Sequence, residues 1–242
     1  CVWSGGGLLA AFCNDQYLVI YSNGEANHPS GLANIPRPPG AAGSDYAAAC
    51  VTRSYHLQAA FYKIPLYPGD LGTTLNSNNQ ALFDGQTDPA AVPGMGLPDS
   101  GPASISVSGQ SIFPLYNNIA AVAYADCEID QCSAHAGQGF DYHYHGDPYH
   151  PTAGVCMYSD EDYSSSATAH PPLIGWGLDG FDTYGRHLST SSVGYSVPLD
   201  NCGGHEHNDE SGAAMAYHYH SQVVNMTTSG GQSYQAYVAG VY

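Results

Sequence analysis

The sequence predicts an all-β fold with few short helices, in which duplicated β-hairpin units form a sandwich-like, disulfide-containing domain. Glycine, tyrosine and proline are abundant, with 29, 20 and 16 copies, as is typical of chains rich in turns and strands. Short runs of alternating polar and apolar residues recur between turn signals. The phrase Tyr-His-Tyr-His occurs twice, at 142–145 and 217–220, each time after a Cys-x-x-His element.

The first strand-like run is Tyr17 to Tyr21, which ends in the turn signal Ser22-Asn23-Gly24. Residues 1–16 contain a Gly-Gly-Gly run and are predicted to form an N-terminal arm that can contact another subunit. Residues 17–242 are predicted to form one domain. Within it, residues 69–102 are rich in Gly, Asn, Asp and Pro, which predicts a long surface excursion with little regular structure.

Two segments have the pattern of a strand, a tight turn and a second strand. They begin at Ser104 and at Leu173, with central glycines at Gly109 and Gly180 that lie 71 positions apart. The Cys-x-x-His elements follow at an offset of 70 and the tetrapeptides at an offset of 75. We therefore expect duplicated units at residues 103–145 and 173–220, related by approximate pseudo-two-fold symmetry.

Helix signals are poor elsewhere in the chain. Only 119–125 and 211–216 are rich enough in alanine to suggest a turn or two of helix, and both are too short to be stable alone. The last stretch, 221–242, alternates Val, Tyr and Ala with polar residues and should form one or two strands.

The two tetrapeptides predict a metal site. In a strand, alternate side chains share a face, so the histidines of each tetrapeptide point one way and the tyrosines the other. If the two strands face each other, four imidazoles converge, and the histidines of the Cys-x-x-His elements bring the number to six. The predicted ligands are His143, His145, His218, His220, His135 and His205.

Neutral imidazole suits copper, zinc, nickel and iron, so copper or zinc is the expected cofactor and calcium is less favoured. For a single His-x-His pair, surface histidines on a polar strand face would be the better explanation. Two identical tetrapeptides with matching upstream elements favour the metal site. A site with six protein ligands would be structural, whereas three or four ligands would leave a position for water and for chemistry.

Four acidic residues could orient the imidazoles through their second ring nitrogen. They are Asp141, Asp147, Asp179 and Asp200, of which the last two lie in turn-like contexts that favour capping of their own backbone. The run 160–162 lacks the ligand spacing of a calcium loop and is more typical of a solvated turn. The pattern gives no role to His150, His170, His187 and His207, and it makes His28 an ordinary loop histidine.

Composition limits the partners of the chain. Four Lys and Arg against 21 Asp and Glu give a formal net charge of −17, which argues against nucleic acid or an anionic membrane as a partner. No apolar run approaches the roughly 20 residues that span a bilayer. Seven cysteines in a turn-rich chain favour disulfides and an extracellular or cell-surface location, with thiolate metal ligands as the alternative. Asn225 begins an N-glycosylation acceptor motif, a position for glycans in a secreted protein.

The sequence resembles the YHYH-domain family of secreted and surface proteins. The resemblance is carried by the twin tetrapeptides, by Ser22-Asn-Gly-x-x-x-His28-Pro, by Ile174-Gly-Trp-Gly-Leu-Asp-Gly-Phe-Asp-Thr-Tyr-Gly185 and by Leu199-Asp-Asn-Cys-Gly-Gly-His205, over most of residues 17–220. It implies an extracellular β-rich domain with a histidine cluster, and no particular reaction.

The chain departs from the usual pattern after the second tetrapeptide. Cys156 follows the first copy, whereas no cysteine follows Cys202, so a symmetric pair of disulfides is excluded. The expected bridges are Cys132 with Cys156 and Cys13 with Cys50. The odd number of cysteines leaves at least one unpaired within the chain, with Cys1 as the first candidate.

The favoured function is a non-catalytic extracellular metal-binding protein, a subunit of a surface layer or fibre. Terminal strands, in residues 1–21 or 230–242, could complete the sheet of a neighbour and build a homo-oligomer or homopolymer. The alternative is a secreted copper or zinc enzyme, redox or hydrolytic, that uses the same histidines. Simple metal scavenging is a third interpretation. The sequence has neither a Gly-x-Ser-x-Gly nucleophile motif nor a phosphate-binding glycine loop.

Overall fold

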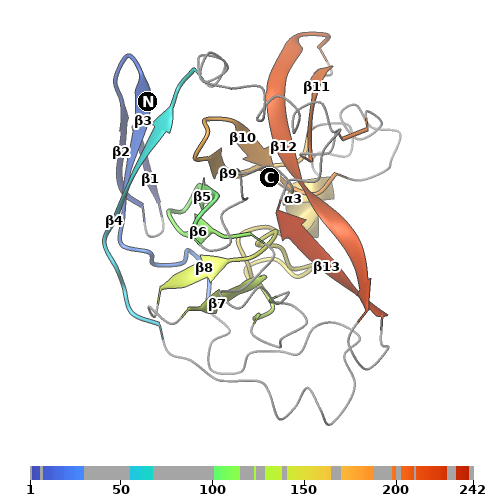
Figure 1. The fold of residues 1–242 in the computed structure, drawn as a ribbon. Helices are drawn as coiled ribbons and strands as arrows, with labels where there is room; N and C mark the ends of the chain where they lie inside the picture. Colours follow the sequence, from blue (N-terminus) through green and yellow to red (C-terminus); the bar gives the residue numbers. More distant parts are fainter. Residues whose placement is uncertain are drawn as a thin grey trace, which may run out of the picture.

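A computed structural model folds the part of the chain that it describes around two β-sheets, with one short helix (Figure 1). The predicted β-rich fold is therefore confirmed. The structure describes residues 2–5, 8–29, 55–67, 101–114, 123, 129–137, 141–164, 170–187, 198–199, 203–209, 211–227 and 233–239.

The first sheet is antiparallel and lies at the left of Figure 1, with the strands in the order β1-β2-β3-β4. Its strands are β1 (Val2–Gly5), β2 (Leu8–Cys13), β3 (Tyr17–Ser22) and β4 (Ala60–Pro65). β3 confirms the strand expected from Tyr17 to Tyr21. β1 and β2 come from the expected arm, and β2 pairs with β3 along most of its length.

The second sheet has nine strands. Eight of them are neighbours in the order β11-β12-β10-β9-β5-β6-β8-β7, and β13 pairs with the C-terminal half of β12. The strands are β5 (Ser104–Ser106), β6 (Ser111–Ile112), β7 (Ala134–Ala136), β8 (Tyr142–Tyr144), β9 (Leu173–Gly177), β10 (Asp182–Tyr184), β11 (Gly204–Asn208), β12 (Ala214–Thr227) and β13 (Ser233–Ala239). β12 and β13 confirm the strands expected in the last stretch.

The second sheet extends in both directions from its central antiparallel pair, β5 and β9, where Ile105 lies opposite Trp176. On one side β5 turns into β6, which runs parallel to β8, and β8 pairs antiparallel with β7. On the other side β9 turns into β10, which runs parallel to β12, and β12 pairs antiparallel with β11. Both hairpins turn at a glycine with positive φ, 94° at Gly109 and 101° at Gly180. The predicted strand, turn and strand at each position are confirmed.

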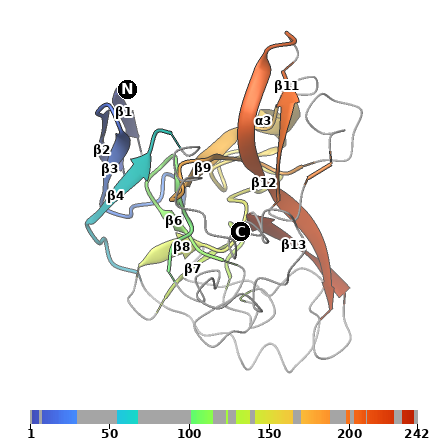
Figure 2. The same cartoon turned by 45° about the horizontal axis from the view of Figure 1, so that its top comes forward.

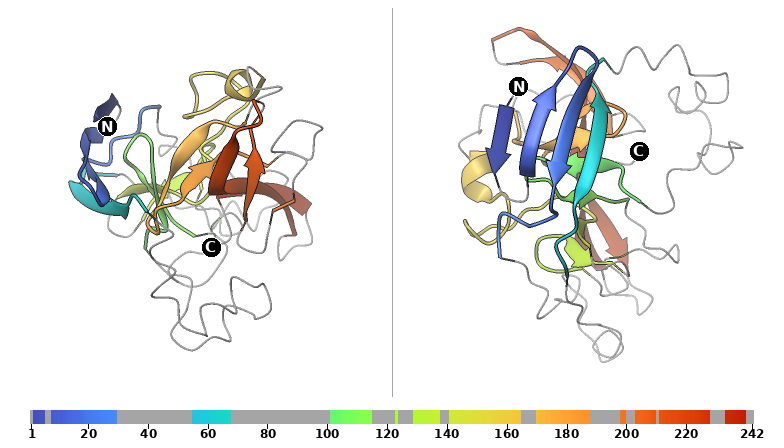
Figure 3. Two further views of the ribbon diagram at one scale, coloured as in Figure 1. Left: turned by 90° about the horizontal axis from the view of Figure 1, so that it is seen from above. Right: turned by 90° about the vertical axis from the view of Figure 1, so that its left-hand side faces the viewer.

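The two sheets pack on each other through one apolar cluster. Ile20 and Ile64 from the first sheet and Ile105 from the second are at most 1% exposed, and Trp176 packs against them. The Tyr62 hydroxyl on β4 also hydrogen-bonds Ser111 on β6 at 2.5 Å. Figures 2 and 3 show the first sheet lying against the β5–β6 region, and this contact holds the hairpin next to β8 in place.

The helix predictions were wrong where the structure tests them. Residues 211–216 form a turn and then the start of β12, because pairing of Ala214 with Asn208 of β11 overrides the helix propensity of alanine. The helix α3 (Asp160–Ser164) occupies the acidic run instead. Ser159 begins it, since its hydroxyl accepts from the Glu161 amide while its own amide donates to Asp162. The other expected helix, at 119–125, lies almost wholly outside the described residues.

Cys132 and Cys156 form a disulfide, with a Cα–Cα distance of 5.4 Å, as expected. Cys13 is also disulfide-bonded, and its expected partner Cys50 lies outside the described residues, as do Cys1 and Cys202. Among the described residues, no helix has the length and hydropathy that crossing a bilayer requires.

Candidate metal centres

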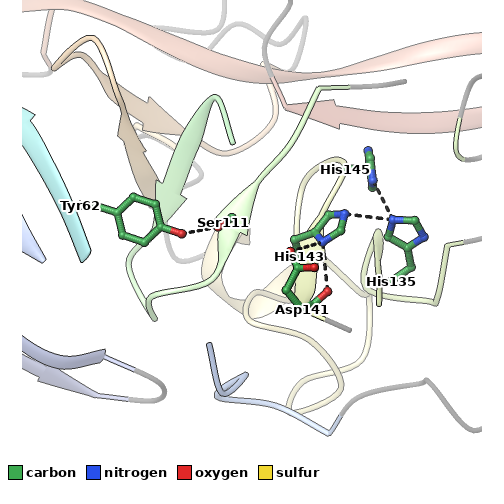
Figure 4. A network of polar contacts seen from close by, with 6 residues as sticks. All are labelled: Tyr62, Ser111, His135, Asp141, His143 and His145. Atoms are coloured by element: carbon green, nitrogen blue, oxygen red, sulfur yellow. Dashed lines mark hydrogen bonds and ion pairs between the residues drawn. The ribbon is translucent and has the colours of Figure 1, made fainter. Parts of the chain in front are cut away.

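The first candidate centre consists of His135, His143 and His145, and we call it the three-histidine centre. His135 on β7 lies opposite His143 on β8, and His145 follows β8 on the same face. The Nε2 atom of His135 lies 3.0 Å from Nε2 of His143 and 3.0 Å from Nε2 of His145. Figure 4 shows the three rings converging. All three side chains are buried, with at most 4% exposure.

The contacts of Nδ1 determine which nitrogen of each imidazole carries the hydrogen. Nδ1 of His143 lies 3.1 Å from both the carbonyl and the carboxylate of Asp141, and Nδ1 of His145 lies 2.5 Å from the Pro114 carbonyl. Because these oxygens only accept, both Nδ1 atoms carry hydrogen, and the neutral form of each ring presents the lone pair of Nε2 to the centre. Burial lowers the pKa of His145 to about 3, so its ring is neutral at pH 7.

The three nitrogens therefore cannot satisfy one another. Nε2 of His135 can donate at most one hydrogen, whereas two lone pairs face it. A cation at the centre would be bound by all three nitrogens. An ion that lies 2.0–2.1 Å from imidazole nitrogens holds neighbouring ligands about 3 Å apart, which fits the separations seen here.

A rigid turn before β7 places His135. Ser133 has a left-handed backbone with φ of 62°, and its carbonyl accepts from the His145 amide at 2.7 Å. The Asp130 carboxylate accepts from the amides of Cys132 and Ala134 at 2.8 and 3.1 Å and from the Tyr142 hydroxyl at 2.7 Å. The disulfide of Cys132 then ties this turn to Cys156.

The tyrosines of the first tetrapeptide point to the opposite face, as predicted. The Tyr144 hydroxyl, in a fully buried side chain, donates to Nε2 of His28 at 2.7 Å. Nδ1 of His28 donates to the Pro29 carbonyl at 3.1 Å, which leaves Nε2 as the acceptor. Burial raises the pKa of Tyr144 well above its ordinary value, so the hydroxyl keeps its proton. His28, an ordinary loop histidine by sequence, thus supports the strand that carries the centre.

The second candidate centre contains five histidines whose ligand atoms all lie within 4.8 Å of one another. β11 and β12 supply two each, and one precedes β9. We call it the five-histidine centre, and its members are His170, His205, His207, His218 and His220. Nε2 of His170 lies 2.9 Å from Nε2 of His218.

Four of these rings are anchored through Nδ1 on main-chain carbonyls. The pairs are His170 with Pro171 at 3.0 Å, His207 with Asn208 at 2.8 Å, His218 with Ala216 at 2.7 Å and His220 with Gly185 at 2.9 Å. In the neutral form of each ring, Nε2 therefore offers a lone pair. Burial lowers the pKa of His170 to about 3 and of His220 to about 2, so these rings are neutral at pH 7. Two lone pairs at 2.9 Å repel, and Nε2 of His220 is buried with no hydrogen-bond partner among the described residues.

The six histidines predicted from sequence thus lie in two centres, which differs from the shared site on a symmetry axis that we expected. In each copy, the histidine of the Cys-x-x-His element lies opposite its own tetrapeptide, His135 with His143 and His205 with His218. Four strands separate β12 from β8 in the sheet order. Local antiparallel pairing therefore brings each tetrapeptide into a centre of its own.

His170 and His207 belong to the five-histidine centre, although the sequence pattern gave them no role. His207 follows His205 by two residues and repeats the His-x-His spacing of the tetrapeptides, a signal that could have identified it. His170 has no such signal, because only the sheet topology brings it to His218. His150 belongs to neither group and accepts from the Thr152 amide at 3.0 Å.

The acidic residues play different parts. Asp141 contacts His143, and the hydrogen bond lowers the pKa of its carboxyl. Asp147 is fully buried and pairs with Arg186 at 3.6 Å. Asp179 accepts from the Phe181 amide at 3.2 Å, which is the turn capping expected of it, and from the Tyr219 hydroxyl at 2.7 Å. Asp200 lies outside the described residues.

Comparison with known families supports the resemblance noted in the sequence. A family described as "YHYH protein" matches residues 61–196, which is more than half of the chain and includes the first tetrapeptide. Searches of curated proteins and of solved structures found no significant match. From the extent of the family match, we conclude that the chain belongs to the YHYH protein family.

Proposed function

We propose that this protein is an extracellular metal-binding protein that holds one transition-metal ion in each of its two histidine centres. The observation that carries the proposal is the approach of His170 and His218, whose Nε2 atoms lie 2.9 Å apart while both Nδ1 atoms face carbonyl acceptors. Neither nitrogen has a hydrogen to place between them at neutral pH. A bound cation would turn this repulsion into two metal–ligand bonds.

Copper or zinc is the metal that this ligand set favours. Both groups consist of histidines alone, and neutral imidazole binds these ions better than calcium or magnesium, which prefer oxygen ligands. The formal net charge of −17 would also raise the concentration of divalent cations near the chain.

A structural role for the metals follows from the elements that each centre joins. The three-histidine centre links β7 to β8, both only three residues long, and the five-histidine centre links β11 and β12 to the segment before β9. Short strands gain much of their stability from such cross-links. The disulfide of Cys132 with Cys156 and the bonded Cys13 support an oxidising, extracellular location.

We also infer that the two halves of the second sheet are duplicated units. Supporting contacts recur at the offsets found in the sequence. The carbonyls of Pro114 and Gly185 accept from His145 and His220 at Nδ1. The carbonyl of Ser133 accepts from the His145 amide, and the carbonyl of the residue 70 positions later, Gly203, accepts from the His220 amide.

One observation favours an enzyme as the second candidate. The three-histidine centre offers three ligands among the described residues, the number that catalytic zinc sites use while a fourth position stays open to water. Redox or hydrolytic chemistry at a copper or zinc ion there would need solvent access. Exchange of a metal-bound water, measured by magnetic relaxation of the solvent with copper bound, would separate this candidate from the structural role.

Anomalous diffraction from crystals of the zinc-loaded or copper-loaded full chain tests the proposed function. The proposal expects two peaks, one among the Nε2 atoms of each centre. No peak at either centre, or peaks only at surface carboxylates, would overturn it.

A further inference from the structure

The two centres share a common core of three imidazoles. In the three-histidine centre the tetrapeptide contributes two rings and the opposite strand one, and the five-histidine centre contains the same arrangement in His205, His218 and His220. The two tetrapeptide rings are held by matching acceptors at Nδ1. The centres therefore differ chiefly in what surrounds this core.

The five-histidine centre has two further rings. Nε2 of His170 lies 2.9 Å from Nε2 of His218, and the ring centroid of His170 lies 4.9 Å from that of His220. The ring of His207 lies 4.8 Å from that of His205, and its Nε2 atom is buried with no hydrogen-bond partner among the described residues. Since Nδ1 of both added rings faces a carbonyl, both can offer only Nε2 to an ion.

The three-histidine centre cannot take an added ring at the matching position. The residue two places after His135 is Gly137, where the second unit has His207. A Cβ atom at Gly137 would lie 2.9 Å from Cε1 of His143, a distance that would force this ring to move. Phe113 stacks on His143 with the ring centroids 3.9 Å apart, which limits how far His143 can shift.

The number of imidazoles affects copper and zinc differently. Zinc is satisfied by three nitrogens and one water in a tetrahedral arrangement. Cupric copper prefers a tetragonal arrangement of four or more nitrogens, so a fourth imidazole strengthens its binding more than it strengthens that of zinc.

We propose that His170 and His207 determine metal specificity, so that the five-histidine centre selects cupric copper over zinc while the three-histidine centre discriminates less between them. The inference rests on the proposed function, because it assumes that both centres bind metal. Gly137 stands at the matching position of the three-histidine centre, which has three histidine ligands among the described residues.

The test uses the unmodified full chain loaded with two equivalents of zinc and then given one equivalent of cupric copper. One zinc ion should be released, and the copper should give a single electron paramagnetic resonance signal with four nitrogen ligands. Two signals in equal amounts, or one signal with three nitrogens, would overturn the specificity proposal. A chain that takes up no zinc at all would overturn the proposed function instead, so the two failures are distinguishable.

Variants then assign the effect to residues. The double variant His170→Ala, His207→Ala should lower the affinity of the five-histidine centre for copper by about 10–100-fold, a loss seen even when residues that only support metal ligands are replaced. The affinity for zinc should fall much less. The control is His150→Ala, outside both groups, which should change neither affinity. His170→Asn with His207→Asn repeats the test with polar side chains, and circular dichroism verifies folding of each metal-free variant. Equal losses for copper and zinc would contradict the assignment.

Discussion

At the scale of single residues, the second nitrogen of each imidazole determines what the first can do. Main-chain carbonyls hold Nδ1 of His145, His218 and His220, whereas His143 also meets the carboxylate of Asp141 at 3.1 Å. A carboxylate at this place makes the imidazole a better donor to a metal. The residue two places before His218 is Ala216, which supplies only its carbonyl.

Replacement of Asp141 should weaken the three-histidine centre alone. Asp141→Asn keeps the carbonyl contact and removes the charge, and because the Asp141 side chain is 38% exposed we expect the low end of the usual range, about a tenfold loss of zinc affinity. Isothermal titration with zinc measures it. The matched variant Ala216→Asp should strengthen the five-histidine centre. An unchanged zinc affinity of the three-histidine centre in Asp141→Asn would contradict this prediction, because the carbonyl contact alone would then suffice to hold His143.

At this scale, the local sequence pattern predicts the structure wherever strand geometry alone decides it. The alternation in Tyr142 to His145 correctly separates a histidine face from a tyrosine face, because successive side chains of a strand point to opposite faces. It fails for His170, whose partner His218 lies 48 positions away on a strand that local spacing cannot place. It also fails for His28, whose bond to the Tyr144 hydroxyl joins the loop after β3 to β8.

At the scale of elements, turns position the strands that carry the centres. The turn before β7 is fixed by the Asp130 carboxylate, by the left-handed Ser133 and by the disulfide from Cys132 to Cys156. Tertiary pairing decides the cases in which propensity misleads, as in the alanine-rich start of β12. The glycine turns of both hairpins were predictable, since positive φ there favours glycine.

Removal of the disulfide should lower stability and loosen the nearby centre. The bridge closes a separation of 24 residues, so the variant Cys132→Ala, Cys156→Ala should lose about 3 kcal/mol of unfolding free energy in urea. Zinc affinity should fall at the three-histidine centre, because His135 follows the freed turn, and should stay unchanged at the five-histidine centre. Equal losses at both centres would contradict this local role.

At the scale of the whole molecule, two sheets and a strand order of β11-β12-β10-β9-β5-β6-β8-β7 separate the two tetrapeptides. The β-rich class, the two hairpins and the last strands were predictable from composition and alternation. The number of centres was not, because it depends on which strands lie between β8 and β12, and long-range strand order leaves no periodic signal in the sequence.

The metal-free protein should lose stability as the pH falls from 7 to 5. His145 and His220 have pKa values of about 3 and about 2 in the folded chain, below the ordinary value of 6.5, so unfolding takes up protons in this range while carboxylates stay largely ionised. The free energy of unfolding is therefore highest above about pH 6.5. For each ring that stays neutral in the folded chain, it should fall by about 1–2 kcal/mol by pH 5. Urea unfolding at several pH values measures this. The variant His220→Gln should show a shallower slope, and an equal slope would contradict the burial argument.

The most direct test of two separate centres is the metal content of the full chain after zinc loading and removal of excess metal, measured for three proteins. The unmodified chain should retain two zinc ions, and His143→Ala with His145→Ala should retain one, as should His218→Ala with His220→Ala. Retention of a single ion by the unmodified chain, lost when either tetrapeptide is altered, would mean that both tetrapeptides share one centre and would contradict the account.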